Sequence, residues 1–469
     1  MPAAALHATL WKAADRLRGS MDAAQYKDYV LSLVFLRRMC GDTRWTALAN
    51  EVASAPDQGA ALIAAATDEL AAARPDLAGV LPPIVAAGVD LSRLAGLISL
   101  IAELPAAGDP RDLLGEVYEY FLGQFARAEG KRAGEFYTPA SVVTLLVEML
   151  QPFSGRVYDP CCGSGGMFVQ AEKFVLAHHG QPDAISVFGQ ESNERTWRLA
   201  RMNLAIHQVA GSLGERPADT FAADQHPDLA ADFILANPPF NMSSWARDAS
   251  RDWAYGVPPA GNANFAWLEL IAGKLAPGGR AGVVLANGSL SSRQSGEGEI
   301  RAAMVEAGIV SCVVALPPQL FRTTPIPACL WLLEAGAPRE ILVIDARQRG
   351  TMADRTERFL GAADIAAIAG AYQAWRQASQ AGAAFPDVPG FCKSVSLPEI
   401  RQHDHVLTPG RYVGAPERGN PDGEPVADRV ERLTKELVAC FEESARLEQA
   451  VRRQIEIARN YSESAALPS

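Results

Sequence analysis

Residues 156–166 have the sequence Arg-Val-Tyr-Asp-Pro-Cys-Cys-Gly-Ser-Gly-Gly, and the fold is decided here. The run 156–158 predicts a short strand, and a helix is expected from Met167 onward. Between them, Gly163, Gly165 and Gly166 allow the backbone to approach a ligand closely. A glycine turn after a strand is weak evidence for a ligand by itself, so its interpretation depends on the surrounding sequence.

Short β-rich runs alternate with helical stretches in the middle of the chain. The runs are 156–158, 186–188, 233–235, 281–285, 310–316, 329–333 and 341–344. Strands separated by helices of about 10–15 residues are typical of a parallel, doubly wound sheet. The sequence therefore predicts an α/β fold with a Rossmann-like sheet.

The segments on either side of the sheet have different patterns. The first is rich in alanine and predicts helices at 6–17, 26–39 and 112–125, with a loop at 105–110. After a Pro- and Gly-rich stretch, residues 426–460 predict one long polar helix. We therefore expect a helical N-terminal domain (1–126), the α/β domain (127–414), and a linker with a C-terminal helix (415–469).

The C-terminal helix carries a narrow apolar stripe. Its heptad positions hold Val430, Leu433, Leu437, Cys440, Leu447 and Val451, with Ser444 interrupting the series. Such a stripe is typical of a helix that binds a partner helix. An amphipathic helix packed on its own domain would show the same pattern, and both interpretations stay open.

The composition describes an ordinary globular protein, with 48% hydrophobic and 21% charged residues. No apolar stretch approaches the ~18 residues of a membrane span, and the N-terminus lacks the features of a signal peptide. The seven cysteines include no Cys-x-x-Cys pair, which argues against a disulfide framework and a structural zinc site. We expect a cytoplasmic protein without a bound metal.

The net charge of the chain is −11. This is unusual for a protein that grips duplex DNA alone, because such proteins carry a basic stripe that displaces counterions from phosphates. Either DNA is not the substrate, or another chain holds it.

Asn237-Pro238-Pro239-Phe240 directly follows an apolar run. The N6 amine of adenine is a poor nucleophile because its lone pair is delocalised into the ring, so its methylation needs acceptors that draw the amine toward tetrahedral geometry. The Asn237 side-chain oxygen and the Pro238 carbonyl are two such acceptors. The prolines stiffen the backbone, and Phe240 would stack on an extruded base. A strand followed by a rigid turn explains the same residues without chemistry.

Glu191 stands at the end of the strand that follows the glycine turn. A carboxylate at this position can bind the ribose hydroxyls of an adenosyl cofactor. The chain has no phosphate-cradling Gly-Lys-Ser/Thr, which favours an adenosyl ligand without phosphates. Cys161 and Cys162 are potential nucleophiles, although a small apolar packing role suits them better.

Gly134-Glu135-Phe136-Tyr137-Thr138-Pro139 precedes the first strand. A polar turn explains this element, with Pro139 near the start of a helix over 140–150. The functional alternative places Tyr137 and Thr138 against the methionine end of the cofactor.

Taken in their order along the chain, the motifs at 134–139, 159–166 and 237–240 resemble those of N6-adenine DNA methyltransferases of the gamma class. The resemblance is strongest to the modification (methyltransferase, M) subunit of type I restriction–modification systems. It covers most of the chain, because 10–19 and 26–31 resemble that family's N-terminal helical domain. Further segments that resemble the family are 262–267, 285–289 and 407–413.

The resemblance implies an S-adenosylmethionine-dependent enzyme that methylates N6 of an adenine flipped out of double-stranded DNA. It gives roles at the target base to Asn237, Pro238, Pro239 and Phe240. It gives cofactor contacts to Glu135, Phe136, Tyr137, Thr138, Asp159, Gly163, Ser164, Gly165, Gly166, Glu191 and Asp219. Asp219 is chosen because Ala218-Asp219-Thr220 best matches the family's Gly-Asp/Asn-Thr element, although Asp224 competes with it.

The segment 415–469 is too short for a base-reading domain, so we expect a separate DNA specificity subunit that docks on the C-terminal helix. The resemblance also implies a second copy of this subunit and a restriction (translocase-nuclease) subunit. Two alternatives stay open. One is a methyltransferase of the same fold that acts on a glutamine side chain or RNA guanine, and the other is a non-catalytic scaffold that binds cofactor.

Overall fold

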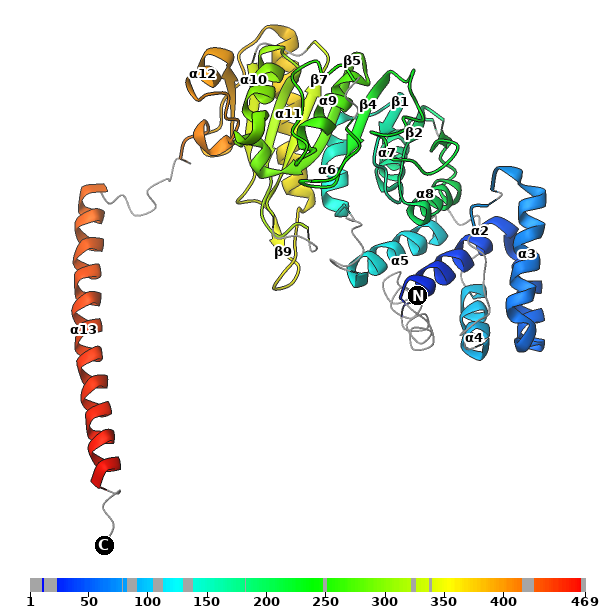
Figure 1. Ribbon diagram of the computed structural model, residues 1–469, viewed down its shortest axis with the longest axis horizontal. Coiled ribbons are helices and arrows are strands. Elements are labelled where there is room, and N and C mark those ends of the chain that lie inside the picture. Colours follow the sequence, from blue (N-terminus) through cyan, green and yellow to red (C-terminus); the bar gives the residue numbers. More distant parts are fainter. Residues whose placement is uncertain are drawn as a thin grey trace. The chain divides into compact units, whose positions relative to one another are not determined.

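The computed structural model describes residues 11, 23–77, 79–81, 91–103, 113–129, 138–181, 183–247, 251–321, 326–336, 340–415 and 426–464. The chain falls into two compact units, Met1–Gly414 and Ala415–Ser469. The first unit combines a helical region with an α/β sheet (Figure 1). The second contains the helix α13 (Val426–Ser464), which confirms the helix predicted over 426–460.

A nine-stranded sheet forms the centre of the first unit, in the order β11-β8-β6-β7-β5-β4-β1-β2-β3. The strands are β1 (Gly155–Asp159), β2 (Ile185–Gly189), β3 (Gly211–Ser212), β4 (Ala231–Ala236), β5 (Leu275–Ala286), β6 (Val310–Ala315), β7 (Ala328–Glu334), β8 (Glu340–Asp345) and β11 (Cys392–Ser396). Strands β3, β2, β1, β4 and β5 run parallel. Each predicted run lies in a strand, except that the run 310–316 extends one residue past the end of β6, and the expected α/β fold is confirmed.

The sheet is mixed rather than parallel throughout, which corrects one detail of the prediction. β7 pairs antiparallel with both β5 and β6, and β11 pairs antiparallel with β8. A parallel return needs a long crossover connection, usually a helix. The described part of the connection between β6 and β7 contains no helix, so the chain returns beside β6 in the opposite direction.

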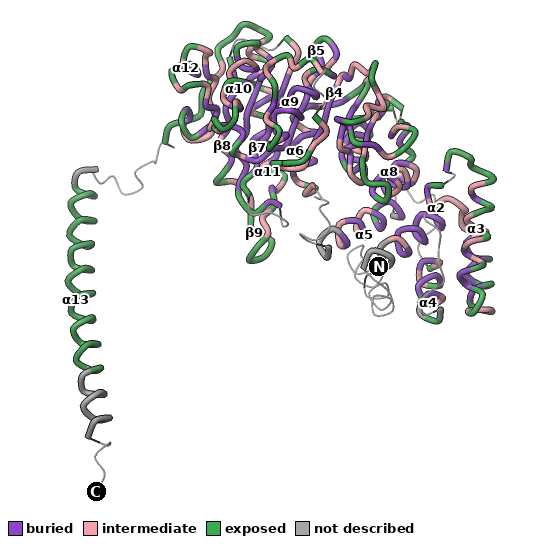
Figure 2. The backbone as a smooth tube through the Cα atoms, in the orientation of Figure 1, coloured by how far each residue is buried: buried purple, intermediate pink, exposed green. Residues whose placement is uncertain are grey.

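Helices cover both faces of the sheet. On one face, α6 (Ala140–Leu150), α7 (Gly166–Ala177) and α11 (Ala362–Ala381) contribute to the hydrophobic core. On the other face, the core receives side chains from α9 (Asn264–Gly273), α10 (Glu297–Glu306) and α12 (Leu397–Gln402). Figure 2 shows the strands between these layers coloured mostly as buried. A small hairpin joins β9 (Thr351–Met352) to β10 (Arg358–Phe359).

The helical region has a core of its own. It is built from α2 (Ala23–Ser54), α3 (Gly59–Ala73), α4 (Leu91–Ala102) and α5 (Leu113–Glu129). The helices predicted at 26–39 and 112–125 lie within α2 and α5, apart from one residue. The loop predicted at 105–110 lies outside the described residues, as does the helix predicted at 6–17 apart from Trp11.

The helix α8 (Glu194–Ile206) belongs to both cores. Its Trp197, Ala200 and Leu204 pack into the core beside the sheet. Its Leu199, Met202 and Ile206 pack into the core of the helical region. The helical region and the sheet are therefore joined through a shared helix, and a domain boundary at 126/127 stays a prediction.

The apolar stripe of α13 is exposed. Exposed fractions range from 47% for Leu433 to 58% for Val430 and Val451. Phe441 and Ile455 on the same helix are exposed as well. In the described part of the chain, no helix has the length and apolar character needed to cross a membrane.

The absence of a side chain at Gly282 in β5 allows α6 to pack closely against the sheet. Its position in turn affects the residues that precede α6. A Cβ at this position would lie 2.6 Å from Leu146 Cδ2 and 3.3 Å from Leu150 Cδ1, both on α6. Because the surrounding core is packed, Gly282→Ala should lower the free energy of unfolding by about 1–3 kcal/mol. Urea denaturation measures this change.

Gly370→Ala in α11 is the matched control. A Cβ there has no atom within 4 Å, so the variant should equal the wild type or gain up to about 1 kcal/mol from helix propensity. Equal stability of the two variants would contradict the packing argument.

Candidate functional site

The glycine turn connects β1 to α7. The backbone N–H of Cys161 donates to Asp159 Oδ1 at 3.0 Å, which closes the start of the turn. Gly163 and Gly165 have φ angles of +55° and +78°, a conformation that side chains other than glycine disfavour. The turn is also tied to the end of β2, because Cys162 N–H donates to the Gln190 carbonyl at 2.9 Å. The glycines are therefore needed for this path of the backbone.

Glu191 lies against the glycine turn. Its Oε2 accepts the backbone N–H of Gly163 at 3.2 Å, and its Oε1 accepts that of Asn193 at 2.7 Å. The carboxylate thus bridges the turn and the residue that caps α8. This is the place where a ribose-binding acid would be needed in a doubly wound fold.

Asp159 is an unusual carboxyl group because its side chain is buried at the end of β1. Burial raises the pKa of Asp159 to about 7, and the nearby Glu191 carboxylate adds to the rise. The hydrogen bond from Cys161 acts in the opposite direction. A positive charge in the pocket would stabilise the carboxylate, so this group favours a cationic ligand.

The two cysteines of the turn are unsuited to act as nucleophiles. Burial raises the pKa of the Cys162 thiol well above its usual value, and the carboxylates of Asp159 and Glu191 raise it further. A thiol reacts as its thiolate, which is scarce under these conditions. Cys162 packs in the hydrophobic core, in line with the packing role expected from the sequence.

Asn237 follows β4 and faces the segment before α6. Its Nδ2 donates to Thr138 Oγ1 at 2.8 Å. Its Oδ1 is buried and has no hydrogen-bond partner among the described residues. The amide is therefore held at one end, and its acceptor is left available.

Phe240 is half-buried and contacts Phe321 edge to face, with 5.7 Å between the ring centroids. The next residue, Asn241, exchanges two hydrogen bonds with the buried Asn264. Asn241 N–H donates to Asn264 Oδ1 at 3.0 Å, and Asn264 Nδ2 donates to Asn241 Oδ1 at 2.9 Å. This pair fixes the backbone after the Asn-Pro-Pro-Phe motif, and no local signal in the sequence assigned Asn264 that role.

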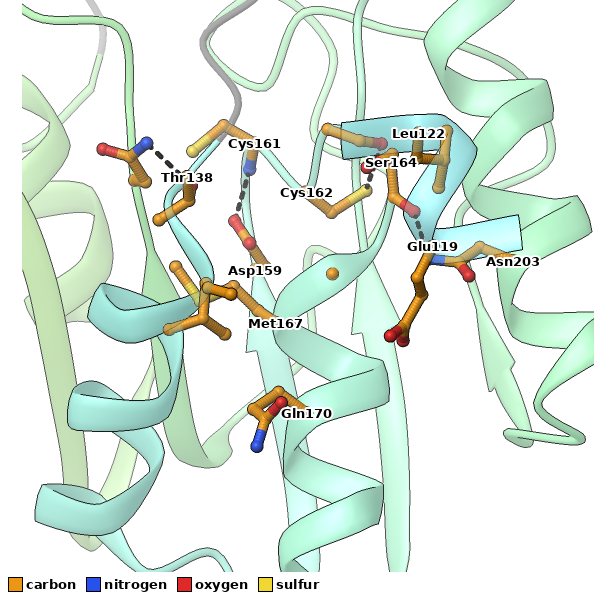
Figure 3. A pocket seen from close by; sticks show the side chains of 15 residues that line it. Glu119, Leu122, Thr138, Asp159, Cys161, Cys162, Ser164, Met167, Gln170 and Asn203 are labelled. Atoms are coloured by element: carbon orange, nitrogen blue, oxygen red, sulfur yellow. Dashed lines mark hydrogen bonds between the residues drawn. The ribbon is translucent and has the colours of Figure 1, made fainter. Parts of the chain in front are cut away.

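One pocket collects much of the predicted site (Figure 3). The predicted residues that line it are Thr138, Asp159, Gly163, Ser164, Gly166 and Asn237. Other predicted residues do not line it, namely Pro238, Pro239, Phe240, Gly165, Glu191 and Asp219. Glu135, Phe136 and Tyr137 lie outside the described residues. The sequence missed several residues that line the pocket, among them Glu119, Leu122, Gln170 and Asn203.

The two candidate aspartates differ in their surroundings. Asp219 is exposed, and it follows Ala218, whose N–H donates to the Glu191 carbonyl at 2.9 Å. Asp224 instead forms an ion pair with Lys274, with 2.7 Å between Oδ2 and Nζ. Asp219 Oδ1 also accepts the N–H of Phe221, at 2.8 Å, and its place beside a cofactor stays a prediction.

Comparison with known proteins gives a consistent result. A model of the N-6 DNA methylase family matches residues 109–420, and a model of the HsdM N-terminal domain matches residues 6–48. The chain is 46% identical to the methylase subunit of the type I restriction enzyme HindI from Haemophilus influenzae over 442 residues, which cover 89% of this chain and 99% of that protein. It is 32% identical to the MjaIX methylase subunit of Methanocaldococcus jannaschii, over 94% of this chain and 89% of that protein.

A solved structure shows the same fold. The methyltransferase subunit of a type I restriction–modification system from Streptococcus thermophilus superimposes with a TM-score of 0.70 and 26% identity, and covers 88% of this chain and 100% of that one. The motifs at the pocket, the family match over 109–420 and the 46% identity to a type I methylase subunit agree. The chain belongs to the N-6 DNA methylase family, as an adenine-specific DNA methyltransferase subunit of a type I restriction–modification system.

Proposed function

We propose that this subunit binds S-adenosylmethionine at the glycine turn and methylates N6 of an adenine flipped out of duplex DNA, with Asn237 at the reacting amine. The observation that carries this proposal is the Asn237 amide, which Thr138 holds at Nδ2 while the buried Oδ1 has no partner among the described residues. An unsatisfied buried acceptor is unfavourable by about 1–3 kcal/mol. The N–H of a substrate amine would satisfy it.

The residues around the turn fit an adenosyl cofactor. A Cβ added at Gly163 or Gly166 would meet no atom within 4 Å, so the turn leaves open space beside its backbone. Glu191 would bind the ribose hydroxyls, and Asp219 would face the adenine. When bound, S-adenosylmethionine supplies a methyl group that the sulfonium charge has already activated.

The protein's part in the reaction is to hold the amine and stabilise charge. Asn237 Oδ1 and the Pro238 carbonyl would accept the two N–H groups, which favours a nitrogen lone pair directed at the methyl group. They would also stabilise the positive charge that develops on nitrogen as the N–C bond forms. Phe240 would stack on the flipped base, and Pro239 would keep the motif rigid.

DNA is the substrate that the relatives favour. The proteins described above are DNA methylases, which argues against a glutamine side chain or RNA guanine as the substrate. A non-catalytic scaffold would not need a buried acceptor beside the cofactor turn. Both alternatives are therefore set aside.

We further propose that α13 docks a separate DNA specificity subunit. The complex would also contain a second copy of this chain, and a restriction subunit would join it for cleavage. The exposed heptad residues of α13 support a helical partner, because binding to one would remove their apolar surface from water, which is favourable. The net charge of −11 also favours a second chain that holds the DNA. The free cysteines suit the reducing cytoplasm, where we place the complex.

Asn237→Ala should lower the methylation rate by at least about 10²–10³-fold, because it removes an acceptor that acts in the transition state. Cofactor affinity and the melting temperature should change little. Tritiated-methyl transfer to unmethylated DNA measures the rate, and Asn50→Ala on the exposed face of α2 is the control. Full activity of the Asn237 variant would remove it from the reaction.

Glu191→Ala should weaken binding of S-adenosylhomocysteine by about tenfold or more, because it removes a charged acceptor at the ribose. Isothermal titration calorimetry measures this affinity. Glu215→Ala removes an exposed carboxylate nearby and should leave the affinity unchanged. If Glu191→Ala and Glu215→Ala bind S-adenosylhomocysteine with equal affinity, the role given to Glu191 is wrong.

Leu447→Asp should weaken binding to the specificity subunit at least about tenfold, because it places a charge in the apolar stripe. Gln449→Asp adds the same charge on the exposed polar face of the helix and is the matched control. Transfer of tritiated methyl to DNA should require the partner and fall with Leu447→Asp. Site-specific methylation by the chain alone would mean that recognition has been assigned to the wrong chain.

A further inference from the structure

We propose that the helical region completes the cofactor pocket. Glu119 of α5 would accept the ammonium group at the amino-acid end of the cofactor. This couples occupancy of the pocket to the position of α5 against the sheet. The inference rests on the cofactor assignment above and adds a residue and a region that the sequence motifs do not contain.

The pocket has a wall from α5. Glu119 and Leu122 line it together with Gln170 of α7 and Asn203 of α8. In Figure 3, Glu119 and Thr138 lie toward opposite sides of the pocket, with the glycine turn between them. Glu191 contacts the same turn from the end of β2 but does not line the pocket, so a ligand with its ribose at Glu191 would reach Glu119 only if it spans the turn.

The acidic side chains that line the pocket offer acceptors for a cationic group. Among the described residues that line it, Glu119 and Asp159 are acidic and none is basic. S-adenosylmethionine carries a sulfonium and an ammonium group against one carboxylate, and its net charge is therefore positive. A carboxylate oxygen has two lone pairs, so Glu119 can accept a further N–H while keeping its present partners.

Those partners hold the Glu119 carboxylate in place. Lys173 Nζ on α7 donates to both oxygens, at 2.8 and 2.7 Å, and His207 Nε2 lies 3.3 Å from Oε1. The Glu119 side chain remains 34% exposed, so the pocket can still reach it. A carboxylate fixed by its neighbours has little rotational freedom left to lose on binding a ligand.

Contacts run from the turn through α8 to the helical region. Asn203 Nδ2 donates to the Ser164 carbonyl at 2.8 Å. Tyr118 Oη, next to Glu119 in α5, donates to the Leu199 carbonyl at 3.4 Å. A ligand that binds both the turn and Glu119 would therefore stabilise the packing of α5 against α8.

The test compares two ligands on the full chain by calorimetry. S-adenosylhomocysteine has the amino-acid end, and 5′-methylthioadenosine lacks it. Glu119→Gln should weaken S-adenosylhomocysteine about tenfold and leave 5′-methylthioadenosine unchanged. Glu116→Gln, on the same helix at an exposed position, should change neither affinity.

Lys173→Met separates binding from a structural role. It removes the partner that fixes Glu119 while keeping the carboxylate, so affinity for S-adenosylhomocysteine should fall much less than in Glu119→Gln. An equal loss in Lys173→Met and Glu119→Gln would show that only the ion pair matters and would overturn the proposal. No loss in Glu119→Gln, or equal losses for both ligands, would also overturn it.

Hydrogen exchange on the wild type avoids any variant that fails to fold. S-adenosylhomocysteine should slow exchange of the α5 amides, and 5′-methylthioadenosine should not. Equal protection by the two ligands would contradict the contact with Glu119. Failure of the wild type to bind either ligand would instead reject the cofactor assignment itself.

Discussion

The fully buried side chain of Gln190 connects the loops at the edge of the sheet where the pocket lies. Its amide makes three hydrogen bonds of 2.8–3.1 Å to the backbone of segment 218–225. Its own backbone pairs with that of Asp159 and Cys162 in the glycine turn. Because a buried amide left unpaired is unfavourable by about 1–3 kcal/mol, these loops have to take their positions together. The site is therefore one rigid edge rather than a set of independent loops.

Sequence reasoning succeeded where the signal is local. α6 has the predicted bounds because Pro139 precedes a run of apolar residues at helical spacing, and the strand runs are continuous. It failed where the outcome depends on distant packing. Nothing near β7 specifies its antiparallel direction, and nothing near Glu119 indicates that α5 reaches a pocket built by β1 and β4. The pairing of Asn241 with Asn264 is equally non-local, because one asparagine in a turn and another at the start of a helix carry no shared periodic pattern.

Negative charge has opposite effects on the two proposed ligands. The acidic lining of the pocket attracts a cationic cofactor, whereas the net charge of −11 repels the phosphates of DNA. Under the proposed function, cofactor binding would need only this chain, while stable contact with DNA would need positive charge from another chain. An enzyme divided in this way would have little tendency to methylate DNA at random, because a subunit of net charge −11 would gain little from phosphate contacts.

The shared helix α8 also limits how this protein can evolve. A helix with one face in each of two cores has few surface positions at which substitutions are harmless, since Leu199 and Ala200, adjacent in sequence, belong to different cores. Because both cores take side chains from α8, neither core is complete without this helix. An N-terminal region transplanted from a relative would meet a foreign α8 surface. We therefore expect recombination between such genes to be best tolerated at crossovers that carry α8 together with the helices that it contacts.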